Sequence, residues 1–266
     1  MSTEFELKDL IKDGIEKLQK ASDLDATVDA WLLAEEVLGI TRVQYFINPQ
    51  RLVNKEDADK FFKFIDMRCN KIPLQHITGK QEFMGLSFNV NEDVLIPRQD
   101  TECLVEEVLK KVKPENHILD VCTGSGCIII SVQKLMKDRC HCFATDISEE
   151  ALKVARQNAE HLDADVTFWQ GDLFESVDGR FDCIVSNPPY IESEVIQGLE
   201  PEVREHEPML ALDGKEDGLF FYRKIIKEAK NYLQPGGWLL FEIGYLQGSA
   251  VSSLLEECGY QNITVK

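Results

Sequence analysis

Apolar residues in the first 70 positions recur with the period of helices. A Thr3–Glu6 pair with capping-box spacing precedes the first stripe, and Gly39 stands where a helix C-cap is expected. Three stripes recur at intervals of three and four residues: Leu7, Leu10, Ile11, Ile15 and Leu18; Val28, Trp31, Leu32 and Leu38; Ala58, Phe61, Phe62 and Ile65. They predict the core of a small helical domain over residues 1–72, ended by Pro73.

The period then changes from helical to alternating. Phe83 and Gly85, followed by Leu86, Phe88 and Val90 on alternate positions, predict a β-hairpin within residues 76–90. We expect residues 73–92 to link the helical domain to a second domain.

Residues 93–266 alternate between apolar runs and amphipathic stretches. Helices are predicted at 100–112, 126–137, 148–161 (capped by Ser148), 217–233 and 246–257. Strands are predicted at 117–122, 141–146, 166–169, 181–186 and 238–243. Strands separated by helices of this length predict βαβ units. The fold class is therefore α/β, with a doubly wound, mostly parallel sheet.

Composition and charge narrow the function classes. The net charge of −18 argues against a free-standing nucleic-acid binder, which normally carries a basic footprint, although self-repulsion that keeps the chain soluble explains the charge equally well. The sequence contains no run of about 18 apolar residues, so it predicts no membrane-spanning helix. The acidic N-terminus lacks the apolar segment of a secretory signal.

The eight cysteines form no CxxC pair, and Cys122, Cys142 and Cys183 lie in apolar runs. We expect core thiols in a reducing cytoplasm, with no metal site and no disulfide framework.

A glycine-rich turn follows the first predicted strand. It comprises Asp120, Val121, Cys122, Thr123, Gly124, Ser125 and Gly126. Ligands of open α/β sheets bind outside the carboxyl ends of the strands, and glycines allow the backbone to approach them. Asp146 ends the next strand 20 residues after Gly126, where a carboxylate can accept both hydroxyls of a ribose. A tight βα turn without a ligand is the alternative reading.

The ligand predicted for this turn is S-adenosylmethionine rather than a dinucleotide. The dinucleotide fingerprint requires a third glycine where this chain has Ile129. Asp120 can face the ammonium group of an amino-acid moiety, directly or through water. After the third strand, Asp172 can accept from an adenine amino group while Leu173 packs on the ring, although Gly-Asp is also ordinary turn chemistry.

The sequence Asn187-Pro188-Pro189-Tyr190 follows the fourth strand. Two prolines fix the backbone, so the Asn187 side-chain oxygen and the Pro188 carbonyl become two neighbouring acceptors. That pair suits an NH2 group on a planar acceptor, on which Tyr190 can stack. An amide nitrogen is a poor nucleophile, so positioning for in-line attack on the sulfonium methyl group supplies much of the rate. A merely rigid turn is the alternative.

These residues together resemble the Asn-Pro-Pro-Tyr class of amino-methyltransferases, on the class I S-adenosylmethionine-dependent fold. The flanking sequences resemble the peptide chain release factor glutamine N5-methyltransferase family over residues 25–264. They are PLQHITG (73–79), EF (82–83), LIPRQDTE (95–102), EPEV (200–203), EP (207–208) and LALDG (210–214).

The resemblance implies N5-methylation of the glutamine in the Gly-Gly-Gln motif of class 1 release factors, with S-adenosyl-L-homocysteine as the product. It implies donor contacts from Cys122 to Gly126 and from Asp146, Leu173 and Asn187, while Asn187 to Tyr190 hold the glutamine. Cys122 stands where many members have glycine. The family also continues into a final antiparallel strand, whereas this chain ends at Lys266 in the sixth strand. We expect residues 263–266 to be frayed, bound against the fifth strand, or paired with another molecule.

Two other functions remain open from the sequence. A methyltransferase acting on amino groups of nucleic-acid bases would need a basic track, and no Lys/Arg cluster lies near Asn187. A non-enzymatic module that binds the cofactor would not need the intact Asn187-Pro188-Pro189-Tyr190 sequence. We therefore expect release factors as partners, with no direct nucleic acid and no membrane.

Overall fold

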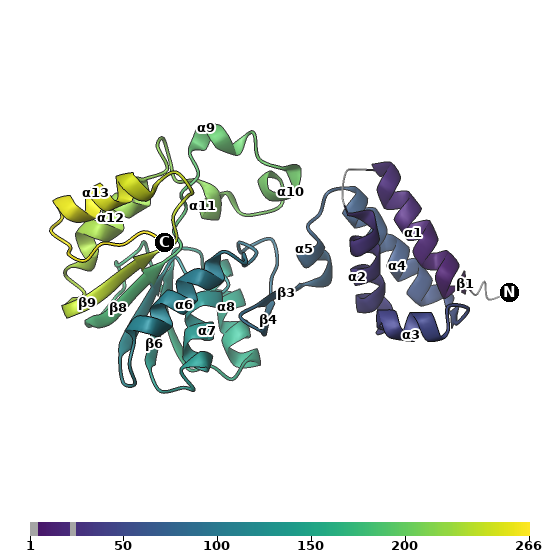
Figure 1. Cartoon of the computed structure of the whole chain (residues 1–266), viewed down its shortest axis with the longest axis horizontal. Helices are drawn as coiled ribbons and strands as arrows, with labels where there is room; N and C mark the ends of the chain where they lie inside the picture. The colour runs from purple at the N-terminus through teal and green to yellow at the C-terminus, as the bar shows by residue number, and fades with distance from the viewer. Residues whose placement is uncertain (1–4, 22–24) are drawn as a thin grey trace. The chain divides into compact units, whose positions relative to one another are not determined.

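The computed structural model describes residues 5–21 and 25–266. The chain divides into two compact units, Met1–Gly79 and Lys80–Lys266 (Figure 1). Thr3, the first residue of the expected capping box, lies outside the described residues. Its partner Glu6 is in a short strand rather than in a helix.

The first unit is built from helices. They are α1 (Leu7–Ala21), α2 (Ala26–Leu38), α3 (Arg42–Ile47), α4 (Lys55–Cys69) and α5 (Leu74–Thr78), with β1 (Phe5–Glu6) and β2 (Leu52–Val53) as an antiparallel pair. Gly39 caps α2 in the left-handed conformation, as expected. Proline was expected to end the helical set, but Pro73 instead precedes α5, because its fixed φ of −53° suits a helix start.

The helical core follows the predicted stripes with one correction. Leu10, Phe61 and Ile65 are fully buried, so the aromatic stripe is core. In α2, however, Val28 and Leu32 stay 39% exposed, whereas Ala30, Leu33 and Ala34 are buried instead. The small alanines let α2 approach α1 and α4 closely, so this face of the helix packs inward.

The second unit opens with the predicted hairpin. Strands β3 (Lys80–Phe83) and β4 (Leu86–Asn89) pair antiparallel around Met84 and Gly85. Both turn residues have positive φ (51° and 74°), as a two-residue turn that follows the right-handed strand twist requires. The Met84 N–H donates to the Glu102 carboxylate at 2.6 Å, which ties the turn to helix α6.

A parallel sheet forms the centre of the second unit, with strand order β7-β6-β5-β8-β9 in the described residues. The strands are β5 (His117–Val121), β6 (His141–Asp146), β7 (Val166–Gln170), β8 (Phe181–Ser186) and β9 (Leu233–Phe241). Helices α6 (Thr101–Lys111), α7 (Cys127–Leu135) and α8 (Glu149–His161) cover one face, and α12 (Phe220–Ala229) and α13 (Gly248–Glu257) the other (Figure 1). The doubly wound α/β prediction is confirmed.

Alternate strand residues separate two apolar cores. Ile118 and Cys183 pack toward α6 and α7, whereas Leu119 and Ile184 pack toward α12. Strand β9 begins at Leu233, five residues before the predicted start, because a register shift between Phe181 and Cys183 lets Leu233 pair first. All eight cysteines lie in the described residues as free thiols. Cys142 and Cys183 are buried as predicted, whereas Cys103 is exposed.

A chain excursion over residues 191–214 separates β8 from α12. It carries the short helices α9 (Ser193–Ile196), α10 (Pro201–Arg204) and α11 (Met209–Leu212). Its two ends are joined by a bridge between Ile191 and Asp213. The Ile191 N–H donates to the Leu212 carbonyl at 3.0 Å, and the Gly214 N–H donates to the Ile191 carbonyl at 2.8 Å.

The C-terminal residues lie outside the sheet, as expected of residues 263–266, which lack their usual ladder partner. Within the described residues, 261–266 carry no strand, and β9 has a hydrogen-bonded neighbour on the β8 side alone. The Lys266 ammonium instead pairs with the Glu107 carboxylate on α6 at 2.6 Å. An isolated segment without a ladder partner has no reason to stay extended as a strand.

Candidate functional site

A cavity of about 1060 Å³, counted to its open mouth, lies at the carboxyl ends of the sheet strands. This is where open α/β sheets bind ligands. The predicted site residues on its wall come from four strand ends: Cys122, Thr123, Gly124 and Ser125 after β5; Asp146 at the end of β6; Asp172 and Leu173 after β7; Asn187 and Pro189 after β8. Asp120, Gly126, Pro188 and Tyr190 are not on the wall.

The loop between β5 and α7 is held in an unusual backbone conformation. Cys122, Gly124 and Gly126 all have positive φ, of 63°, 55° and 79°. Gly126 combines this positive φ with a close approach to α8, where an added Cβ atom would lie 3.3 Å from Ala155 Cβ, so glycine fits this position best. The Thr123 N–H donates to the Thr145 carbonyl at 3.0 Å, which holds the loop beside β6.

Asp120 lies beneath this loop rather than on the cavity wall. Its side chain is fully buried, and Oδ2 accepts the Thr123 hydroxyl at 2.6 Å. Burial raises the pKa of Asp120 to about 7, against the lowering effect of the Thr123 hydrogen bond. Oδ1 is buried without a hydrogen-bond partner. Oδ1 can therefore still accept a hydrogen bond. That it accepts one from the ammonium group of a ligand remains a prediction.

Asp146 lies where β6 meets the start of α8. Its Oδ2 accepts the Gly124 N–H and its Oδ1 accepts the Ser148 N–H, each at 2.9 Å. A carboxylate has about four acceptor sites, so Asp146 keeps acceptor capacity for a ligand. Burial raises the pKa of Asp146 from its ordinary value.

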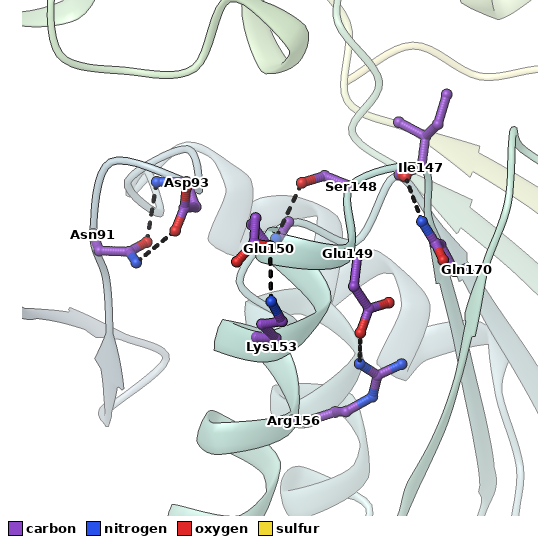
Figure 2. Close-up of polar contacts among 10 residues, drawn as sticks. Asn91, Asp93, Ile147, Ser148, Glu149, Glu150, Lys153, Arg156 and Gln170 are labelled. Carbon is purple, nitrogen blue, oxygen red and sulfur yellow. Dashed lines mark hydrogen bonds and ion pairs between the residues drawn. The ribbon is translucent and has the colours of Figure 1, made fainter.

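The rim beside α8 is also ordered by polar contacts. Asn91 and Asp93 form a closed turn in which Asn91 Oδ1 accepts the Asp93 N–H at 3.1 Å (Figure 2). Ser148 caps α8 by accepting the Ala151 N–H at 3.1 Å, as predicted. Asp93, Ile147 and Ser148 line the cavity, so this rim offers a ligand both polar side chains and the apolar Ile147 side chain.

The loop after β7 contributes one buried and one exposed residue. Leu173 is 5% exposed, with a φ of 53°, and it lines the cavity. Asp172 also lines the cavity, but its Oδ2 pairs with the Lys224 ammonium at 2.9 Å. An amino group on a ligand must therefore compete with or share this carboxylate.

The turn after β8 presents Asn187 and Pro189 to the cavity. Pro188 is buried behind them, and Tyr190 is half-buried. Burial raises the pKa of Tyr190, so its hydroxyl stays protonated at neutral pH. An ordered turn with one amide side chain on the wall can orient a ligand, but it carries no nucleophile.

Three residues that hold Tyr190 were missed from the sequence. The Gln247 side-chain amide donates to the Tyr190 carbonyl at 3.0 Å, while its oxygen accepts the Gly244 N–H at 2.9 Å. A Cβ atom at Gly218 would lie 2.4 Å from the Tyr190 carbonyl oxygen, and one at Gly214 would lie 2.7 Å from the Tyr190 carbonyl carbon. The Gly214/Gly218 pair was a visible signal for this close approach, whereas Gln247 carried none.

A fourth missed residue, Arg98, supplies the cavity with a positive charge. Among the described residues on the wall, Arg98 is the only basic side chain, beside Asp93, Asp146 and Asp172. Its guanidinium group pairs with Glu207, whose side chain is 1% exposed. A cavity with three carboxylates and one cation suits a ligand that carries more positive than negative charge.

Neither a membrane-spanning helix nor a metal-binding cluster occurs among the described residues. No helix there is long and apolar enough to cross a membrane. No group of three or more His, Cys, Asp or Glu side chains there is arranged to hold a metal ion.

Comparison with known proteins gives consistent results over both units. Residues 9–79 match the family model "PrmC N-terminal domain", and residues 99–200 match "Methyltransferase small domain". The chain is 42% identical over 264 residues to a release factor glutamine methyltransferase of Clostridium botulinum, covering 97% of this chain and 93% of that protein. It is 43% identical over 231 residues to one of Geobacter sulfurreducens, covering 86% and 81%.

Among solved structures, a methyltransferase of Pyrococcus furiosus aligns with a TM-score of 0.52 at 22% identity. The alignment covers 68% of this chain and 83% of that one. This likeness shows the fold alone.

Proposed function

Because the chain belongs to the family of release factor glutamine methyltransferases, we propose that it methylates the N5 amide nitrogen of the glutamine in the Gly-Gly-Gln motif of class 1 release factors, with S-adenosylmethionine as methyl donor. One observation carries the proposal: a single cavity joins the glycine-rich loop and Asp146 to Asn187.

The cavity residues suit S-adenosylmethionine, which carries two positive groups and one carboxylate. In our assignment the ribose hydroxyls donate to the free acceptor sites of Asp146, and the adenine ring packs on Leu173. The three carboxylates and one guanidinium group of the wall give it a net negative charge, which suits a donor with a net positive charge. When bound, the donor supplies a sulfonium-linked methyl group that requires in-line attack.

The chain's own contribution to the chemistry is orientation. Asn187 Oδ1 and the Pro188 carbonyl each accept one hydrogen of the glutamine NH2 group, which turns the nitrogen lone pair toward the methyl group. These bonds strengthen as positive charge develops on nitrogen, so they favour the transition state over the bound substrate. No strong base is required, because the methylated amide loses its proton readily afterwards.

We further propose that residues 1–72 recognise the release factor and take no part in the chemistry, since the site residues all lie in 93–266. The acidic cavity wall disfavours a polyanionic substrate. The free thiols suit a reducing cytoplasm, where release factors meet the ribosome.

The test is transfer of labelled methyl groups to purified release factor, to the same protein with Gly-Gly-Gln changed to Gly-Gly-Ala, and to total RNA and DNA. We expect label on the unaltered release factor alone. Label on RNA or DNA would support the nucleic-acid function instead, and label on both release factor proteins would place the methyl group elsewhere.

A further inference from the structure

A carboxyl group lies directly beside the Asn187 turn. Glu242 follows β9, and its N–H donates to the Ser186 carbonyl at 3.1 Å, which continues the pairing of Ser186 with Phe241. Parallel pairing thereby places Glu242 next to Asn187 at the same edge of the sheet.

The backbone of Glu242 is fixed in this position. The Tyr222 hydroxyl donates to the Glu242 carbonyl at 2.8 Å, and Tyr222 itself is fully buried in α12. A side chain that starts from so constrained a backbone has few directions open to it.

Three side chains that can donate hydrogen bonds converge on the Glu242 carboxyl group. Thr101, Asn187 and Tyr190 lie close enough to it to favour its ionised form. Glu242 Oε2 is nevertheless buried without a hydrogen-bond partner of its own. Burying a carboxyl group is costly unless donors satisfy it, so these neighbouring donors favour a bond to Glu242.

We propose that Glu242 is a positioning residue for methyl transfer: its carboxylate accepts the Asn187 side-chain N–H and so leaves Asn187 Oδ1 facing the acceptor nitrogen. An asparagine amide can present either its oxygen or its NH2 group, and only the oxygen accepts from a substrate NH2. A carboxylate accepts and cannot donate, so it selects the productive orientation. The inference rests on the proposed function.

The ionised state of Glu242 also strengthens the acceptor. A negative charge hydrogen-bonded to the amide N–H polarises it, which increases the negative charge on Asn187 Oδ1. That oxygen then stabilises the positive charge that develops on the attacked nitrogen. The Tyr190 hydroxyl donates to the same carboxylate in this arrangement, which fixes the aromatic ring beside the acceptor.

Protonation of Glu242 would remove this selection. Burial raises the pKa of Glu242 above its ordinary value, against the lowering effect of the bonds from Thr101 and Asn187. The titratable groups that face it are Asp100 before α6, Cys127 on α7, Tyr190 after β8 and Tyr222 on α12. The protonated acid donates a hydrogen bond, so the Asn187 amide is free to turn around. Turnover should therefore fall on the acid side with an apparent pKa above the ordinary glutamate value.

The experiment compares full-length wild type with Glu242→Gln, Glu242→Ala and, as a matched control, Glu107→Gln on α6, whose carboxylate pairs with Lys110 and Lys266. For Glu242→Ala we expect kcat to fall about 10- to 100-fold. The donor Kd and the KM for release factor should stay within about twofold, because ground-state contacts are retained. Glu242→Gln should keep more activity, since its oxygen can still accept, and should lose the acid limb of the pH profile. Glu107→Gln should behave as wild type.

A second readout does not depend on methyl transfer. The 15N resonance of the Asn187 side-chain amide, assigned by its loss in Asn187→Asp, should shift with pH in wild type and stop shifting in Glu242→Gln. An unchanged kcat in Glu242→Ala, or an acid limb and a pH-dependent amide resonance retained in Glu242→Gln, would overturn the role of Glu242. Failure of the wild type to methylate release factor would instead overturn the proposed function.

Discussion

Replacing Asp146 with alanine tests where the donor binds. The carboxylate accepts the backbone N–H groups of Gly124 and Ser148 and keeps acceptor capacity for the ribose hydroxyls. Hydrogen bonds to a charged group contribute about 1.5–3 kcal/mol. Loss of the ribose contacts should therefore raise the Kd for S-adenosylmethionine about 10- to 150-fold.

Asp146→Asn should not rescue binding. One of its two side-chain atoms becomes an NH2 group, which would face the N–H donor of Gly124 or Ser148. We therefore expect a Kd close to that of the alanine variant. Asp165→Ala, which removes an exposed carboxylate between α8 and β7, serves as the control and should bind as wild type.

Calorimetric titration with S-adenosylmethionine and with S-adenosylhomocysteine measures these affinities directly. Both ligands carry the ribose, so both should lose affinity to the same degree. Melting of the ligand-free proteins checks that each variant is folded. A folded Asp146→Ala protein with wild-type affinity would show that the ribose lies elsewhere.

The remaining predictions concern catalysis, pH and recognition. Asn187→Ala should lower single-turnover rates with release factor far more than it weakens binding, and near-normal rates would refute the orienting role. Asp120 keeps its proton in the folded state up to a pKa of about 7, so stability should fall by up to about 4 kcal/mol between about pH 4 and pH 7 and then level off. In denaturant titrations, the free energy of unfolding of Asp120→Asn should not decrease over this pH range. Deletion of residues 1–72 should preserve donor affinity in calorimetry and abolish methylation of intact release factor, whereas normal methylation would remove their recognition role.

The fold of the second unit was predictable because its signals are local. Each strand from β5 to β8 begins and ends within one residue of its predicted bounds, since apolar runs and helix caps occur together there. In the first unit, α3 and α5 were missed because each is six residues or shorter, too short to display a period. The prediction for α2 was wrong at Val28 and Leu32 because alanines carry little apolar signal, so the stripe of large residues did not reveal that Ala30 and Ala34 face the core.

The cavity wall was predicted in part. Nine predicted residues meet there because parallel strand ends share one edge. Asp120, Pro188 and Tyr190 lie behind the wall, which spacing along one strand cannot reveal. Arg98, Gln247 and Glu242 were not predicted as site residues, because each reaches the site from a loop whose course depends on tertiary packing.

The excursion over residues 191–214 has a consequence for how the site can vary. Its ends are joined to each other by the Ile191–Asp213 bridge, so the number of residues between them does not affect the pairing of the sheet strands. Closing a loop twice as long costs only about 0.6 kcal/mol more. Pro208, Leu210 and Ala211 from this segment nevertheless form part of the cavity wall. The length of the segment can therefore change to admit other acceptors while the strand ends that carry the chemistry stay as they are, provided that Glu207 still pairs with Arg98.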